Sequence, residues 1–194
     1  MPLVLNRTID ATVEPVTADE LKVHLRWEYG NVEESLMESL IKGARRMIEN
    51  LIGRALIDQT WVLKLDHFPG CIEVPRPPFS SLTGLQYVDQ NGDTQAVTSS
   101  LYTVDSSAEP ARIYEAYNKS WPTTYAIRNA VTVTYVAGYG STAASVPEEF
   151  KIAIKLLAAH WFRNREASSP IQQHDIPNGV HALISPYTVQ ILGA

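Results

Sequence analysis

The hydrophobic and polar side chains of residues 31–52 separate onto two faces of a predicted helix. Successive residues of an α-helix lie about 100° apart around its axis, and on this spacing the apolar residues fill one arc of roughly 160°. The apolar arc contains Leu36, Met37, Leu40, Ile41, Ala44, Met47, Ile48, Leu51 and Ile52. The polar arc contains Glu38, Ser39, Lys42, Gly43, Arg45, Arg46, Glu49 and Asn50. The pattern predicts a long helix that buries one broad apolar face and leaves the polar face in solvent.

Local signals mark the ends of two N-terminal helices. Thr17 is followed three residues later by Glu20, which is the spacing of a capping box, and a short helix is expected from there to Arg26. Asn31 is the expected N-cap of the long helix. Gly53 is the expected left-handed residue that ends it. The two helices are expected to pack antiparallel across a short connector.

From Thr60 onward the hydrophobic period changes from 3.6 to 2, which predicts strands. The expected strands cover residues 61–66, 71–74, 82–89, 94–97, 102–105, 112–114 and 131–135. Asn91-Gly92 predicts a tight hairpin turn between two of them. Short strands at this spacing predict a small antiparallel sheet or barrel rather than a β-α-β unit.

Residues 147–165 predict a second long helix that is apolar on two sides. One side carries Phe150, Ala153, Ile154, Leu157, Ala158 and Trp161. A different side carries Ile152, Leu156 and Ala159. Either a helical bundle wraps around this helix, or its second side meets another subunit, because a chain of this size has few elements to cover two faces.

The C-terminal residues predict a short helix from Asn178 to about Ser185, which Pro186 ends. The residues after it, 187–192, alternate like a strand and have no obvious partner nearby. We therefore expect a tail that is available to another protein.

Helices followed by strands and then by helices predict an α+β fold. The economical packing is a helical bundle formed by the N- and C-terminal helices, with a small antiparallel β domain inserted between them. We expect an N-terminal helical hairpin over 15–58, a β-rich insertion over 59–137, C-terminal helices that complete the bundle over 145–187, and a tail over 188–194.

Composition narrows the class of protein. The chain has 194 residues and a net charge of −5, from 16 basic and 21 acidic residues, so it is a poor candidate for wrapping nucleic acid. Its single cysteine, Cys71, excludes an intramolecular disulfide. We find no segment that resembles a signal peptide or a membrane span, and expect a soluble protein made in a reducing compartment.

No catalytic or metal-binding signature is present in the sequence. His160, His174, Asp175 and His181 match no helical ligand spacing. The Gly138-x-Gly140 pair lacks the third glycine of a dinucleotide fingerprint and is expected to be a joint between strand and helix. Cys71 lies in an alternating strand and is expected to be a packed thiol. We expect no enzyme activity and no cofactor.

Tyr114 and Trp121 leave a second class of function open. Together they could form a stacking platform, which would make the β domain a carbohydrate- or cell-surface-binding module. A loop clamp over the β core is the commoner use of such a tryptophan, and no interleaved basic patch accompanies this one.

Several segments in order carry a resemblance to a known family. They are Pro15-Val16-Thr17 through Leu25, Ile48 through Trp61, Val74-Pro75-Arg76-Pro77-Pro78, Tyr135 through Gly140, Val146-Pro147-Glu148, and His160 through Glu166. Over these segments the chain resembles the head–tail connector (adaptor) proteins of tailed bacteriophages, prophages and gene-transfer agents. No single segment is diagnostic, and the likeness rests on their order and spacing from about Pro15 to Tyr187. At Arg163 the family often has an acidic residue, so the resemblance implies no charge pairing there.

The resemblance implies a structural virion protein that forms a ring under the portal and extends the DNA channel toward the tail. A closed ring needs a head-to-tail interface between two different surfaces, and the expected one includes Ile152, Leu156 and Ala159. The expected portal-docking tail is Thr188, Val189, Gln190, Ile191 and Leu192. The implied partners are other copies of the chain, which form the ring either alone or only when assembled on the portal. The portal protein and a tail-side stopper or completion protein are the other implied partners. DNA would pass without specific binding, no membrane would be involved, and the neck would be assembled in the cytoplasm of a bacterial host.

Overall fold

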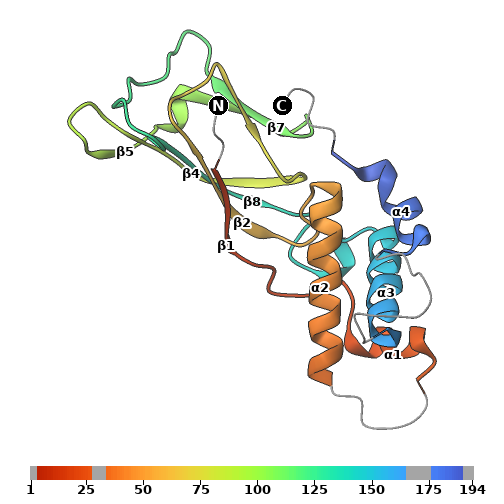
Figure 1. Cartoon of the computed structure of the whole chain (residues 1–194). Helices are drawn as coiled ribbons and strands as arrows, with labels where there is room; N and C mark the ends of the chain where they lie inside the picture. The colour runs from red at the N-terminus through yellow and green to blue at the C-terminus, as the bar shows by residue number, and fades with distance from the viewer. Residues whose placement is uncertain (1–3, 28–33, 165–175, 190–194) are drawn as a thin grey trace. The chain divides into compact units, whose positions relative to one another are not determined.

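A computed structural model describes residues 4–27, 34–164 and 176–189 (Figure 1). It combines helices with antiparallel sheets, so the expected α+β class is confirmed. The chain divides into two compact units. The first, here called the β unit, comprises Met1–Ala11 and Asp58–Tyr139, and the second, the helical unit, comprises Thr12–Ile57 and Gly140–Ala194.

The β unit contains two antiparallel sheets. The larger has the order β1-β2-β8-β4-β5 and the smaller has the order β3-β7-β6. Their bounds are β1 (Val4–Ile9), β2 (Gln59–Leu65), β3 (Cys71–Val74), β4 (Phe79–Val88), β5 (Thr94–Ala96), β6 (Tyr102–Asp105), β7 (Ala111–Glu115) and β8 (Val131–Ala137). The seven expected strands are therefore confirmed, and β1 is an additional edge strand that the sequence pattern did not indicate.

Alternation along the two central strands builds the core of the β unit. Every second residue of β2 and of β8 is buried, as a period of 2 requires. Trp61 on β2 lies opposite Tyr135 on β8. The expected hairpin turn joins β4 to β5, with Gly92 at φ 89°, a left-handed conformation that glycine adopts without steric cost.

The helical unit contains α1 (Ala18–Leu25), α2 (Glu34–Ile52), α3 (Glu148–Arg163) and α4 (Asn178–Ile184). The capping box is confirmed, because the Thr17 hydroxyl accepts from the Glu20 amide while the Glu20 carboxylate accepts from the Thr17 amide. Gly53 ends α2 at φ 71°, as expected. Asn31, the expected cap of α2, lies outside the described residues.

The other three helices of the unit all contact α3. The end of α2 and the start of α3 lie close together, because residues 187–189 contact both. Phe150 of α3 packs on Tyr187, and the Val189 amide donates to the carbonyl of Ile52 in α2. Farther along, Trp161 of α3 reaches the middle of α2 at Gly43. These contacts make α2 and α3 antiparallel neighbours (Figure 1).

The buried face of α2 differs from the face that its sequence pattern predicted. Arg45 and Glu49, expected on the solvent side, are 0% and 3% exposed. Arg45 donates from Nε and Nη2 to the carboxylate of Glu14, at 2.7 and 3.1 Å, and from Nη1 to Glu49 at 2.9 Å. The second oxygen of Glu49 accepts the amide N–H of Leu56 at 3.0 Å. This paired network makes burial of both charges tolerable, so the expectation that they face solvent was wrong.

Candidate assembly surfaces

One side of α3 is covered by the helical unit and the other is accessible. Phe150, Ala153, Ile154, Leu157 and Ala158 are all buried. On the opposite side Ile152 is 41% exposed and Leu156 is half-buried. These two side chains are here called the α3 patch. Ala159, expected beside them, is buried within the single copy.

Charged groups border the α3 patch on both sides. Glu149, one turn before Ile152, is exposed and forms no ion pair with any described residue. Lys155 and Arg163 lie toward α1, where burial lowers the pKa of His24 and the charges of these two residues lower it further. Lys151 is engaged by Glu148 at 2.7 Å, and this hydrogen bond lowers the pKa of the Glu148 carboxyl. The patch is thus apolar at its centre, acidic on one flank and basic on the other.

A second apolar surface runs along α2. Met47 is 36% exposed, and Leu36, Leu40 and Leu51 are only half-buried, although all four belong to the apolar arc of the sequence pattern. We call these four side chains the α2 stripe. Gly43 lies within it, and a Cβ atom there would lie 3.3 Å from Cζ3 of the half-buried Trp161.

The start of the expected tail is attached to its own helical unit. The Val189 amide donates to the Ile52 carbonyl at 2.8 Å, and the Val189 side chain lies against Gly53. Arg54 donates from Nε to the Tyr187 carbonyl at 2.7 Å. Tyr187 itself ends a short 3-10 turn, Ser185–Tyr187, so the strand expected to begin there is not formed at this residue. Thr188 is exposed, and Gln190, Ile191 and Leu192 lie outside the described residues.

The aromatic residues of the β unit are placed as a loop clamp. Trp121 stacks on Phe68 with ring centroids 4.6 Å apart and planes 5° apart, and its backbone N–H donates to Glu115. One face of the Trp121 ring is therefore covered by Phe68. Tyr114 is 40% exposed and Tyr117 is 91% exposed.

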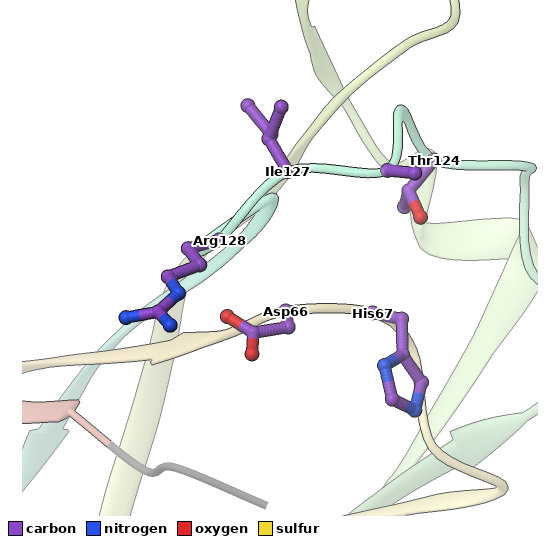
Figure 2. A pocket seen from close by; sticks show the side chains of 6 residues that line it. Asp66, His67, Thr124, Ile127 and Arg128 are labelled. Carbon is purple, nitrogen blue, oxygen red and sulfur yellow. The ribbon is translucent and has the colours of Figure 1, made fainter.

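A shallow pocket beside this loop offers no evident chemistry (Figure 2). It has a volume of about 360 Å³ and is lined by Asp66, His67, Thr124, Ala126, Ile127 and Arg128. One oxygen of Asp66 is used to accept the Asn129 amide N–H at 2.8 Å. The described residues contain no cluster of three or more acidic, histidine or cysteine side chains that could hold a metal ion.

Other candidate residues of the sequence pattern are dispersed. His160 hydrogen-bonds to Asn164, the C-cap residue of its own helix, and His181 is exposed on α4. His174 and Asp175 lie outside the described residues. Cys71 is exposed on β3, so the expectation of a packed thiol was wrong. In the part of the chain that the structure describes, no helix has the length and hydropathy of a membrane span.

Comparison with known proteins gives these surfaces a context. Residues 123–188 match the family described as "Phage gp6-like head-tail connector protein". No curated protein matches the chain by sequence.

Solved structures match over nearly the whole chain. A chain in the neck of an empty gene transfer agent (GTA) particle, computed with C6 symmetry, is 26% identical, with a TM-score of 0.78 and 98% of each chain covered. A chain in the neck of a native GTA particle, computed with C12 symmetry, is 26% identical, with a TM-score of 0.76 and the same coverage. A chain from the virion of a native gene transfer agent is 24% identical over 98% of each chain and shares the fold, with a TM-score of 0.79.

The family match and the neck structures agree with each other and with the resemblance of the sequence segments. Head–tail connectors are a class of structural virion proteins and not a class of enzymes. Residues 123–188 are thus similar to the phage gp6-like head–tail connector family, and the chain as a whole is similar to chains in the necks of gene transfer agent particles.

Proposed function

We propose that copies of this chain close into a ring in the neck of a phage-like particle, under the portal, and that the ring extends the DNA channel toward the tail. The observation that carries the proposal is the α3 patch, in which Ile152 is 41% exposed on an otherwise well-packed helix. Similar chains occur in necks computed with C6 and C12 symmetry, which supports a rotationally symmetric arrangement.

The helical unit would supply the contacts between copies. In this proposal the helices from both ends of the chain form one bundle, the β domain is an insertion in it, and the α3 patch with Ala159 beneath it meets the next copy. A ring closes only if one surface binds a different surface of its neighbour and the rotation between copies returns to the start. Burying Ile152 and Leu156 against another copy would remove apolar area from water, which favours association.

Charge supports a channel that DNA passes without adhering to it. With 21 acidic and 16 basic residues, each copy is net negative, and a ring multiplies this charge around its axis. Tight DNA binding depends on neutralising phosphates with lysine and arginine, so an acidic ring would favour passage over retention.

The tail would engage the portal, and the opposite end of the ring would meet a tail-side stopper or completion protein. Because the Val189 amide is hydrogen-bonded to the Ile52 carbonyl within the same copy, we propose that docking uses the residues after Val189. Truncating the chain after Val189 is therefore expected to keep the fold and to reduce portal binding, measured by co-purification with the portal protein. If the truncated chain binds the portal protein as strongly as the full chain does, this part of the proposal is wrong. We place assembly of the neck in the cytoplasm of the bacterial host.

The ring itself is tested by native mass spectrometry of the chain, alone and with its portal protein. Ile152→Asp is expected to abolish ring formation and to leave the Tm of the single copy nearly unchanged, because an exposed position tolerates a charge. Ile127→Asp is the matched control, since Ile127 is 42% exposed on the β unit. Rings that persist in Ile152→Asp, or that are lost equally in Ile127→Asp, would contradict the proposal.

A further inference from the structure

The side of α2 that is buried does not coincide with its apolar side, and the α2 stripe is the part of the apolar side that is left accessible. On a spacing of about 100° per residue, the buried residues centre roughly 60° away from the middle of the apolar arc, toward Arg45 and Glu49. The ion network with Glu14 holds this orientation from inside the helical unit. The opposite edge of the apolar arc is left at the surface, where Leu36, Leu40, Met47 and Leu51 follow one another along the helix.

The Trp161 side chain of α3 lies against the stripe. A Cβ atom at Gly43 would lie 3.3 Å from Cζ3 of Trp161, so this ring covers the gap that the glycine leaves in the row of side chains. Trp161 also extends the apolar surface from α2 onto α3.

A second copy of the chain is the occupant that these observations favour. A closed ring needs two different complementary surfaces on each copy. Among the described residues of the helical unit, the α2 stripe and the α3 patch are each formed by neighbouring apolar side chains, and Val13, Val23 and Trp27 are also exposed. The borders of the stripe and the patch carry opposite charges: Arg46 is exposed beside Met47, and Glu149 is exposed one turn before Ile152. If the α2 stripe of one copy packed on the α3 patch of another, the basic edge of the stripe would lie against the acidic edge of the patch. Such charge complementarity sets the relative position of the two surfaces and disfavours contact between two stripes or two patches.

We infer that the α2 stripe of one copy packs on the α3 patch of the next, with Arg46 facing Glu149. This inference rests on the proposed ring and adds to it the two surfaces that meet. It also specifies that the contact is heterologous: stripe meets patch, and neither meets itself.

Cysteine cross-linking distinguishes this arrangement from its alternatives. In a Cys71→Ser background, Met47→Cys and Ile152→Cys place one thiol on each surface. Under ring-forming conditions with a short bismaleimide, the chain with both substitutions is expected to give a ladder of multimers, and a mixture of the two single variants is expected to stop at dimers. Each single variant alone is expected to remain uncross-linked.

Two outcomes would overturn the inference. A single variant that cross-links to itself would show a two-fold contact, and rings seen by native mass spectrometry without a ladder would show that other surfaces meet. In the second case the proposed ring survives and only this pairing fails, whereas absence of rings from the unsubstituted chain with its portal protein would remove both.

Charge reversal gives an independent test. Arg46→Glu and Glu149→Arg are each expected to weaken ring formation by at least tenfold, and the double variant is expected to recover most of it. Both residues are exposed in the single copy, so folding is unaffected and circular dichroism should be unchanged. Lack of recovery in the double variant would contradict the facing of Arg46 and Glu149.

Discussion

The β unit and the helical unit use their apolar residues differently. In β2 and β8 the residues that alternate in the sequence are the ones that are buried, so the core of one copy accounts for the pattern. In α2 two charged side chains are buried and four apolar ones remain at the surface. One copy therefore covers the alternating residues of β2 and β8, whereas apolar side chains of α2 remain partly accessible to solvent.

The largest expected effect comes from the network that sets the orientation of α2. Arg45→Met removes the cation that lies between the carboxylates of Glu14 and Glu49, so the buried Glu49 carboxylate loses this ion pair. We expect a loss of about 3–5 kcal/mol in the free energy of unfolding, measured by urea denaturation. The neighbouring exposed change Arg46→Met should cost less than about 0.5 kcal/mol. Equal effects of the two changes would mean that the network does not hold the helix.

A glycine in the helical unit gives the next largest effect. Gly140 has φ 147°, and a Cβ atom there would lie 2.6 Å from Oγ of Ser145, which is itself hydrogen-bonded to Thr142. Gly140→Ala is therefore expected to cost about 1–3 kcal/mol of stability. Gly179→Ala, where the added methyl group meets nothing within 4 Å, is the control and should be neutral or slightly stabilising in thermal denaturation. An unchanged Tm for Gly140→Ala would contradict this account of the site.

A smaller effect is expected in the β unit at alkaline pH. Tyr135 is buried, its hydroxyl donates to the Pro75 carbonyl at 2.9 Å, and burial strongly raises its pKa. In the unfolded chain a tyrosine ionises near its ordinary pKa of about 10. Stability from the protonated form is therefore complete below that pH and is lost as the pH rises above it.

Tyr135→Phe tests this dependence. The change should cost about 1 kcal/mol at neutral pH, because the Pro75 carbonyl loses its donor. Between pH ~9 and ~12 the variant should lose less stability than the unsubstituted chain, measured by denaturant unfolding at each pH. Parallel pH profiles would show that Tyr135 ionises equally in both states.

The smallest effect concerns the α2 stripe itself. Met47→Gln is expected to change the stability of the single copy by less than about 0.5 kcal/mol. Its neighbour Ile48 is fully buried, and Ile48→Gln should cost more than about 2 kcal/mol because a polar amide enters the core. A large cost for Met47→Gln in monomeric protein would mean that the stripe belongs to the core of one copy.

Local features of the fold could be predicted from the sequence, and long-range ones could not. The Thr17 capping box and the turn at Gly92 depend on residues a few positions apart, so their patterns are specific. The pairing of β1 with β2 joins residues about 55 positions apart and left no local signal. Burial of Arg45 likewise depends on Glu14, 31 residues earlier.

The candidate surfaces show the same division. The two-sided pattern of α3 indicated Ile152 and Leu156 as residues outside the main stripe, and both are accessible in the single copy. The α2 stripe could not be predicted, because its residues are typical core residues by pattern and the burial of Arg45 with Glu14 on another side of the helix is a long-range feature. Their role in assembly stays a prediction until the cross-linking and mass measurements are made.

The position of β8 has a consequence for synthesis of the chain. Among the described strands it is the last to leave the ribosome, yet it lies between β2 and β4 and hydrogen-bonds to both. Until it emerges, both neighbours present open edges that can pair wrongly or aggregate. A polypeptide that ends before residue 131 also lacks α3, so under the proposed pairing it would carry the α2 stripe without the α3 patch.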